Sequence, residues 1–131
     1  MTNEEKGIRL LITGGRDFDD VDAIRTALMD VFTTHIVDAV VVGDSRGVDR
    51  IAADFAKEME YSVSIYKALW GKYGKSAGPR RNGFMLKHGE PTHVIAFPGG
   101  RGTADMVNRA VRAGLPIRRA CVDAIETKTG E

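Results

Sequence analysis

Three segments of this chain repeat one order of parts: an apolar run, a short polar loop that contains glycine, and a helical pattern. The apolar runs are residues 8–13, 38–43 and 93–97. Runs without polar alternation are typical of strands that are covered on both faces, and an amphipathic helix must then return the chain across the sheet. Such repeats give parallel strands joined by right-handed crossovers. The chain is therefore predicted to have an α/β fold.

Two further runs complete the predicted sheet, at residues 61–66 and 117–122. Helical spacing of apolar residues predicts connecting helices that begin at Val21, Val48, Arg80 and Thr103. The fold class is thus α/β, a single Rossmann-like domain with a parallel five-stranded sheet and helices on both faces. A length of 131 residues fits one domain. We expect a flexible N-terminus, the domain and a C-terminal tail at residues 1–7, 8–122 and 123–131.

The charge and composition of the chain limit which partners and which cellular compartment are expected. The formal net charge is +1, which does not indicate a protein held by bulk charge on nucleic acid or anionic lipid. No apolar run is long enough to span a bilayer, the N-terminal segment is polar and acidic, and Cys121 is the single cysteine. These features predict a cytoplasmic protein with no membrane partner.

The sequence lacks the common cofactor and metal motifs. The Gly-x-Gly-x-x-Gly fingerprint does not follow the first strand, and no Walker lysine follows a glycine loop. His35, His88 and His93 are scattered without metal-ligand spacing. We therefore expect no metal and no cofactor.

The loop from Pro98 to Gly102 joins a predicted strand to a predicted helix. Glycines let the backbone approach a ligand closely, and the start of the helix adds free N–H groups and partial positive charge. Arg101 and Thr103 supply further donors at the same place. This combination favours an anion site, most often for phosphate, over a turn that merely connects two elements.

Four loops follow carboxyl ends of predicted strands, at residues 14–17, 43–47, 67–79 and 98–102. Ligands of open parallel sheets bind beyond these ends, so the loops are expected to meet at one crevice. The loop at 67–79 is long and has no regular pattern, which is typical of a binding segment.

Cations gather beside this long loop. No acidic residue occurs from Tyr61 through Gly89, whereas Lys75, Arg80 and Arg81 lie there. They predict an anion pocket, with a solvated surface as the alternative. Two aromatic residues among them, Trp70 and Tyr73, are able to stack a base, although Trp70 serves equally well as a loop anchor buried on the core.

Two Arg–Asp pairs follow the first two strands. Asp17 comes after Arg16, and Asp49 comes shortly after Arg46. Either carboxylate is able to accept hydrogen bonds from ribose or to activate water, and the alternative is a salt bridge or helix cap. The candidate ligand-binding residues of the whole crevice are Gly14, Gly15, Arg16, Asp17, Ser45, Arg46, Gly47, Asp49, Trp70, Tyr73, Lys75, Arg80, Arg81, Asn82, Pro98, Gly99, Gly100, Arg101, Gly102 and Thr103.

Four ordered motifs carry a family resemblance: Gly-Gly-Arg-Asp-Phe at 14–18, Gly-Val-Asp-Arg-Ile-Ala at 47–52, residues 73–82, and Phe-Pro-Gly-Gly-Arg-Gly-Thr-Ala-Asp at 97–105. With them the chain resembles the SLOG superfamily, in its YspA-like, cpYpsA-related branch of bacteria and phages. The resemblance implies a Rossmann-like fold that binds nucleotides or nucleotide-derived molecules. Many members are proposed to sense or process such ligands in conflict between bacteria and phages.

The chain more distantly resembles the LOG-type phosphoribohydrolases, whose motif is Pro-Gly-Gly-x-Gly-Thr-x-x-Glu with a catalytic Arg upstream. Residues 98–103 match, Arg81 is the counterpart of the Arg, and Met106 stands at the Glu position. This resemblance implies Arg81 as a catalytic residue, and Asp17 or Asp49 as the replacement for the missing Glu. A third relative, DprA, binds single-stranded DNA on a similar fold.

The leading hypothesis is a protein that binds or senses a nucleotide-derived phosphate compound. The alternatives are a nucleotide N-glycoside hydrolase and, less favoured, a single-stranded nucleic-acid binder. LOG-type relatives pair through helices beside the site, which implies a homodimer. Its apolar patch is expected from Phe84, Met85 and Met106, and packing against the sheet explains these residues equally well.

Overall fold

The computed structural model describes residues 6–121, which form one sheet of five parallel strands in the order β3-β2-β1-β4-β5. This confirms the predicted α/β architecture. The strands are β1 (Ile8–Thr13), β2 (Val37–Gly43), β3 (Val63–Tyr66), β4 (His93–Ala96) and β5 (Ile117–Arg119). The switch in strand order falls at β1, which lies between β2 and β4.

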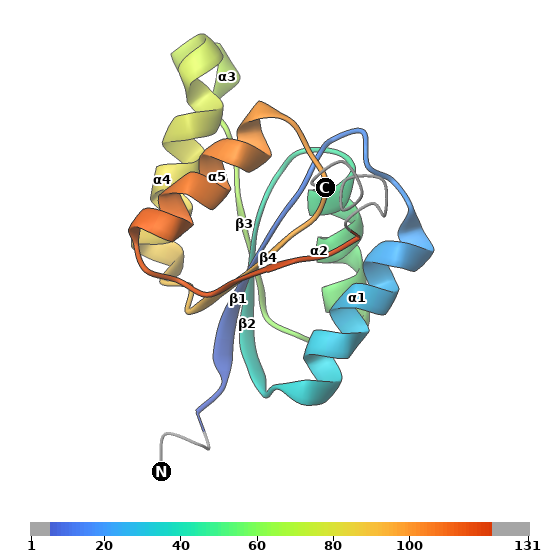
Figure 1. The fold of residues 1–131 in the computed structure, drawn as a ribbon. Helices are drawn as coiled ribbons and strands as arrows, with labels where there is room; N and C mark the ends of the chain where they lie inside the picture. Colours follow the sequence, from blue (N-terminus) through green and yellow to red (C-terminus); the bar gives the residue numbers. More distant parts are fainter. Residues whose placement is uncertain (1–5, 122–131) are drawn as a thin grey trace, which may run out of the picture.

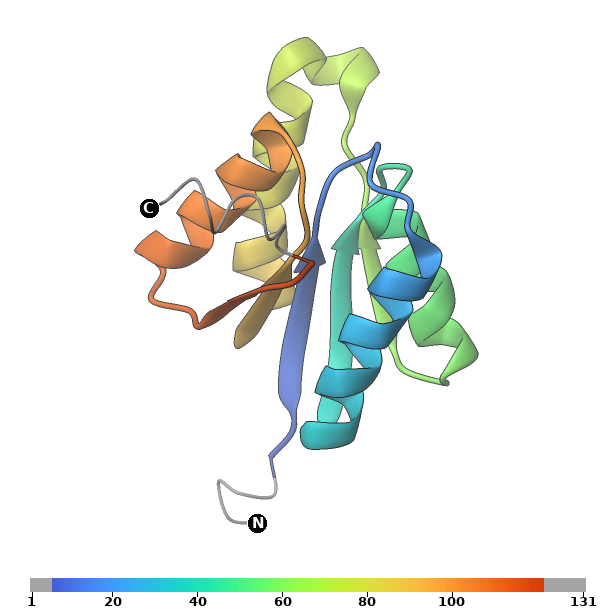
Figure 2. The same cartoon turned by 45° about the vertical axis from the view of Figure 1, so that its right-hand side comes forward.

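Helices cover both faces of the sheet. In Figures 1 and 2, α1 (Val21–Thr34) and α2 (Val48–Glu58) pack on one face, and α4 (Ala77–Gly89) and α5 (Arg101–Arg112) pack on the other. The short helix α3 (Trp70–Tyr73) and a 3₁₀ turn, η2 (Gly74–Ser76), stand above the end of the sheet before α4 begins. Right-handed crossovers that move outward from β1 in opposite directions require this division of the helices.

Alternation along the strands divides the core between the two faces. Leu10 and Ile12 of β1 belong to the buried cluster under α1 and α2. Leu11, between them, belongs to the cluster that contains Met85 of α4 and Met106 of α5. Because the central strands β1, β2 and β4 are covered on both faces, most of their residues are apolar, and this made them recognisable in the sequence.

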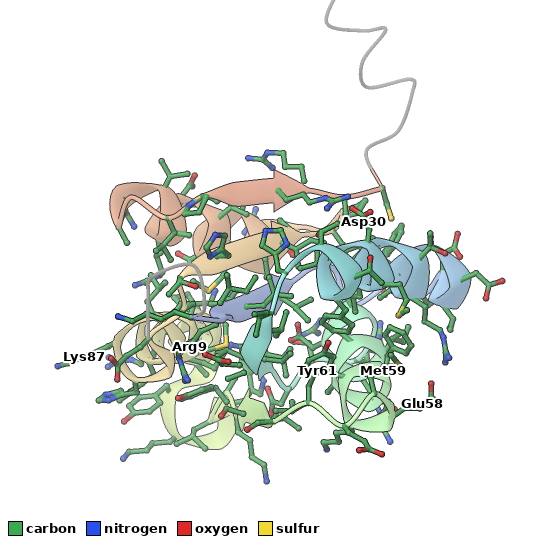
Figure 3. The ribbon with its side chains drawn as sticks, turned by 90° about the horizontal axis from the view of Figure 1, so that it is seen from below. Arg9, Asp30, Glu58, Met59, Tyr61 and Lys87 are labelled. Atoms are coloured by element: carbon green, nitrogen blue, oxygen red, sulfur yellow. The ribbon has the colours of Figure 1, made fainter. Side chains whose placement is uncertain are left out.

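The two ends of the sheet are built differently. Thr13 of β1 pairs with Ala96 of β4, so these strands end at one level, and their loops leave side by side. At the opposite end, shown in Figure 3, Arg9 lies beside α4 and donates from Nε and Nη2 to the carbonyl of Gly89, at 3.0 and 2.9 Å. The side chain thus satisfies a terminal carbonyl of the helix, which has no partner within the helix.

The segment expected to be a long loop is mostly helical. Residues 70–73 form α3, residues 74–76 form η2, and α4 begins at Ala77 rather than at Arg80. Pro79 is the third residue of α4, where a missing N–H costs nothing because the first-turn donors have no intrahelical acceptor. The density of Gly, Lys and Ser concealed this helical segment.

Other boundaries differ by a few residues. β3 begins at Val63 rather than Tyr61, β5 ends at Arg119, and α5 begins at Arg101 rather than Thr103. Val122, assigned to the last strand, lies outside the described residues, as do residues 1–5 and the expected tail. In the described part of the chain, no helix is both long and apolar enough to cross a membrane.

The apolar patch expected for a homodimer is not formed by the three residues named for it. Phe84 is 55 % exposed and stacks on His88, whereas Met85 and Met106 are buried in the core. Phe84 and Met85 are adjacent in α4, where successive side chains point about 100° apart, so one is exposed and the other is buried. Homodimerisation stays a prediction without this support.

Met106 offers a test of the face that α5 turns to the sheet. Met106→Glu places a carboxylate in the apolar cluster and is expected to lower the free energy of unfolding by roughly 3–5 kcal/mol. Met106→Leu conserves volume and is expected to cost less than about 1.5 kcal/mol. Urea denaturation measures both. A Glu variant as stable as the Leu variant would contradict the burial of this position.

Candidate functional site

A cleft of about 810 Å³ lies at the carboxyl end of the sheet. Its walls come from the loop after β1, the loop after β2, the α3–α4 segment, and the glycine loop that leads into α5. The predicted convergence of the four loops is therefore found in the structure. The lining residues that the sequence had singled out are Gly14, Gly15, Arg16, Asp17, Ser45, Asp49, Trp70, Lys75, Arg81, Asn82, Pro98, Gly99, Gly100, Arg101, Gly102 and Thr103.

Two predicted residues of the β2–α2 loop, Arg46 and Gly47, do not line the cleft. Gly47 has a φ of +79°, and a Cβ there would be 2.5 Å from the carbonyl oxygen of Gly15. Only glycine permits both this conformation and this approach. Arg46 donates to Asp17 Oδ1 at 2.8 Å, and both side chains are largely exposed. The sequence pairs each Asp with the Arg of its own loop, whereas this salt bridge joins Arg46 of one loop to Asp17 of the other, and its contribution to stability is small.

Tyr73 and Arg80 also fall outside the lining. The Arg80 guanidinium lies over the Tyr73 ring at 4.5 Å, and its Nε donates to Ser76 Oγ at 3.1 Å. Lys72 Nζ is 5.1 Å from the centre of the same ring. These contacts hold the Tyr73 ring away from the lining of the cleft.

The glycine loop places the amino end of α5 at the cleft. Gly100 is the residue that precedes the helix, and no side chain among residues 6–121 caps it. The first N–H groups of a helix have no intrahelical acceptor, and they carry the positive end of the helix dipole. A Cβ at Gly99 would collide with Thr103 Oγ1 and with the backbone nitrogen of Gly15. The loop therefore depends on glycine for its packing as well as for its open amides.

Arg81 is a fixed cation in the cleft wall, and its side chain is only 9 % exposed. Its Nη1 donates to Asp44 Oδ1 at 3.0 Å and to the Tyr66 carbonyl at 3.4 Å. Its Nε donates to Asn82 Oδ1 at 3.0 Å. Three elements thus hold the guanidinium, which reduces the entropy lost when it binds an anion.

Asp49 is buried in the first turn of α2, and its Oδ2 accepts from the backbone N–H of Ser45 at 3.1 Å. Burial raises the pKa of this carboxyl to about 6, and the Asp44 carboxylate adds to the rise. The hydrogen bond from Ser45 and the charge of Arg81 oppose it. A Cβ at Gly43 would be 2.7 Å from Asp49 Oδ2 and would overlap Arg81, so this glycine makes room for both groups.

Asn82 connects α4 to α5 from a buried position. Its Nδ2 donates to the carbonyl of Gly102 at 3.2 Å and to Asp105 Oδ2 at 3.0 Å. Arg109 Nε donates to the same Asp105 oxygen at 2.9 Å. Asn82 therefore fixes the glycine loop and a carboxylate of the cleft wall together.

The carboxylate that α5 presents to the cleft is Asp105, while Met106 lies in the core. Asp105 is not among the predicted binding residues, because it points about 100° away from position 106, where the LOG motif has its Glu. Further lining residues that were not predicted are Thr13, Phe18, Gly78, Pro79 and Met85. Thr13 and Phe18 flank a predicted loop and were accessible to sequence reasoning, whereas Gly78, Pro79 and Met85 required the true start and phase of α4.

The first half of the chain matches a known family. The family model described as YspA, cpYpsA-related SLOG family matches residues 8–73, about half of the 131 residues. The match includes β1, β2, β3 and α3, and it ends before the glycine loop and Arg81. A search of curated proteins found no match.

The raised pKa of Asp49 makes stability depend on pH. Between about pH 4 and pH 6 the folded protein binds more protons at this carboxyl than the unfolded chain does, so the free energy of unfolding falls as pH rises through that window. The fall amounts to roughly 3 kcal/mol. Asp49→Asn lacks this pH-dependent loss. The free energy of unfolding of the variant minus that of the unmodified protein is therefore expected to increase as pH rises from 4 to 7.

Urea denaturation across this range measures the free energy of unfolding of both proteins. The contributions of all other carboxyl groups are the same in the two proteins and cancel in the difference. Asp54→Asn, at an exposed position of the same helix, is the matched control and is expected to show no comparable gain. A constant difference between Asp49→Asn and the unmodified protein would contradict a raised pKa.

Proposed function

This chain belongs to the YspA, cpYpsA-related SLOG family, and from that premise we propose that its cleft binds a phosphorylated, nucleotide-derived small molecule as a sensor or binding domain. Family membership is consistent with a nucleotide-related ligand. The proposed compartment is the cytoplasm.

One observation supports the proposal above the others: the uncapped amino end of α5 and the fixed guanidinium of Arg81 line the same cleft. A helix amino end binds phosphate through backbone N–H groups, and a buried Arg adds a directional, permanent charge. The phosphate is proposed to lie against the amides of residues 99–103. Asp105 and Asp49 then offer carboxylate oxygens to the hydroxyl groups of a sugar.

Binding without turnover is preferred because the carboxylate of the LOG motif has no counterpart in the cleft. Met106 stands at its position and is packed in the core. Cleavage of a glycosidic bond needs charge stabilisation at the sugar, usually from a carboxylate. Asp105 lines the cleft, but its Oδ2 already accepts from Asn82 and Arg109.

A nucleotide N-glycoside hydrolase is the second candidate function, and Asp49 favours it. A buried carboxyl in a cleft with a pKa of about 6 is suited to proton transfer near neutral pH. Arg81 would bind the phosphate of the nucleotide, and the base would be the leaving group when water attacks the sugar. Asp17 is a weaker candidate for catalysis because it is exposed and paired with Arg46.

Gly100→Val tests the phosphate site. Among residues 6–121, nothing lies within 4 Å of the Cβ position of Gly100, so a valine side chain there projects into open space at the loop. Each charge-assisted hydrogen bond is worth about 1.5–3 kcal/mol, so loss of one or two lowers the affinity for phosphate and AMP at least tenfold. Calorimetric titration measures this loss.

Gly71→Ala is the matched control, because its Cβ position is also open but Gly71 does not line the cleft. Both variants are expected to keep the melting temperature of the unmodified protein. Unchanged phosphate affinity in Gly100→Val would remove the glycine loop as the site.

Incubation with AMP distinguishes the two candidate functions. We expect AMP to be recovered intact by chromatography, with far less free adenine than a LOG-type enzyme releases alongside. Adenine release that disappears in Asp49→Ala, with AMP affinity retained, would establish the hydrolase instead, because such a group acts mainly in the transition state.

A further inference from the structure

Trp70 has an unusual place in the molecule. It is the single tryptophan of the chain, it opens α3, and it is 48 % exposed although it lines the cleft. Tryptophan side chains are on average highly buried. Of the two interpretations of Trp70, the anchor buried on the core is therefore wrong, and the indole ring remains accessible to a ligand.

A glycine of α4 supports the indole ring. A Cβ at Gly78 would be 3.3 Å from Cη2 of Trp70 and 3.9 Å from Cζ2, so the six-membered edge of the indole rests directly on the first turn of the helix. Gly78 and Pro79 line the cleft beside it. The ring is thus backed by α4, while about half of the residue's surface stays open.

Tyr73 provides the contrast, one turn further along the same short helix. Its ring is covered by the Arg80 guanidinium at 4.5 Å, and it does not line the cleft. Two aromatic residues of similar sequence context therefore have different surroundings. The indole alone of these two faces the space that the glycine loop and Arg81 also face.

We propose that Trp70, held in place by Gly78, is the stacking platform for an aromatic base of the ligand. This inference rests on the proposed function and narrows it: the ligand class is a nucleotide with its base attached, not a sugar phosphate or inorganic phosphate. A base has a π face that sugars lack, and stacking on an aromatic side chain raises affinity by roughly 5- to 150-fold. A cleft of about 810 Å³ accommodates a base, a sugar and a phosphate together.

The single tryptophan makes the contact directly observable. Trp70 fluorescence, excited where nucleobases do not absorb, is titrated with AMP, GMP, CMP, UMP, ADP-ribose and ribose 5-phosphate, and the same titrations are followed by calorimetry. At least one base-bearing compound is expected to quench the fluorescence and to bind roughly 5- to 150-fold more tightly than ribose 5-phosphate. Ribose 5-phosphate is expected to bind without quenching.

Three variants separate the platform from a structural role. Trp70→Leu is expected to reduce nucleotide affinity to that of ribose 5-phosphate and to leave ribose 5-phosphate affinity unchanged. Gly78→Ala crowds the ring edge and is expected to weaken nucleotide binding selectively. Tyr73→Leu, the matched control outside the cleft, is expected to retain nucleotide affinity and quenching.

The outcomes are distinguishable. If ribose 5-phosphate binds but no base-bearing compound quenches Trp70 or binds more tightly, the platform is overturned and the phosphate site stands. Equal weakening of nucleotide and ribose 5-phosphate binding in Trp70→Leu also overturns the platform. If none of the compounds binds, the proposed function fails and the platform fails with it.

Discussion

The carboxyl end of the sheet depends on the close approach of three loops at Gly15. Its N–H donates to the Pro98 carbonyl at 2.8 Å, and its own carbonyl accepts from the N–H of Val48 at 3.2 Å. Side chains at Gly47 or Gly99 would collide with the backbone of Gly15. The loops after β1, β2 and β4 are therefore joined through main-chain atoms. A site made in this way presents amide groups that need no side chain to orient them.

The opposite wall of the cleft depends on side chains of α4. Arg81 and Asn82 are adjacent in sequence, and together they contact Asp44 after β2, the Gly102 carbonyl of the glycine loop, and Asp105 of α5. These long-range polar contacts matter for stability, because a buried donor that loses its partner lowers the free energy of unfolding. The residues that are proposed to position the ligand thus also stabilise the fold.

The sequence was sufficient for the features that repeat along the chain. The bounds of β1 were predicted without error, and the loops that follow β1, β2 and β4 meet as parallel strands require. The sequence was insufficient where the surroundings of a residue depend on where a helix begins and which of its faces packs on the sheet. The start of α4 at Ala77 was hidden by Gly and Pro, and without it neither the place of Trp70 beside Gly78 nor the burial of Met85 was accessible.

Asp44 shows a second limit on what the sequence alone can predict. It precedes Arg81 by 37 residues, and no periodicity relates the two positions. Only the parallel packing of β2 beside β3, with α4 above them, places the carboxylate against the guanidinium. The pKa of Asp49 follows from the same arrangement, because its burial and its neighbours are properties of the folded chain.

The near-neutral net charge and the proposed anion site are compatible, because two carboxylates of the cleft are neutralised by cations from outside its lining. Asp17 is paired with Arg46, and Asp105 is paired with Arg109, both cations from outside the lining. Asp49 is partly protonated near pH 6. Among residues 6–121, the structure shows no carboxylate partner for three cations of the lining: Arg16, Lys75 and Arg101. A chain of net charge +1 thus has a locally positive cleft, and an anion is the partner that complements it.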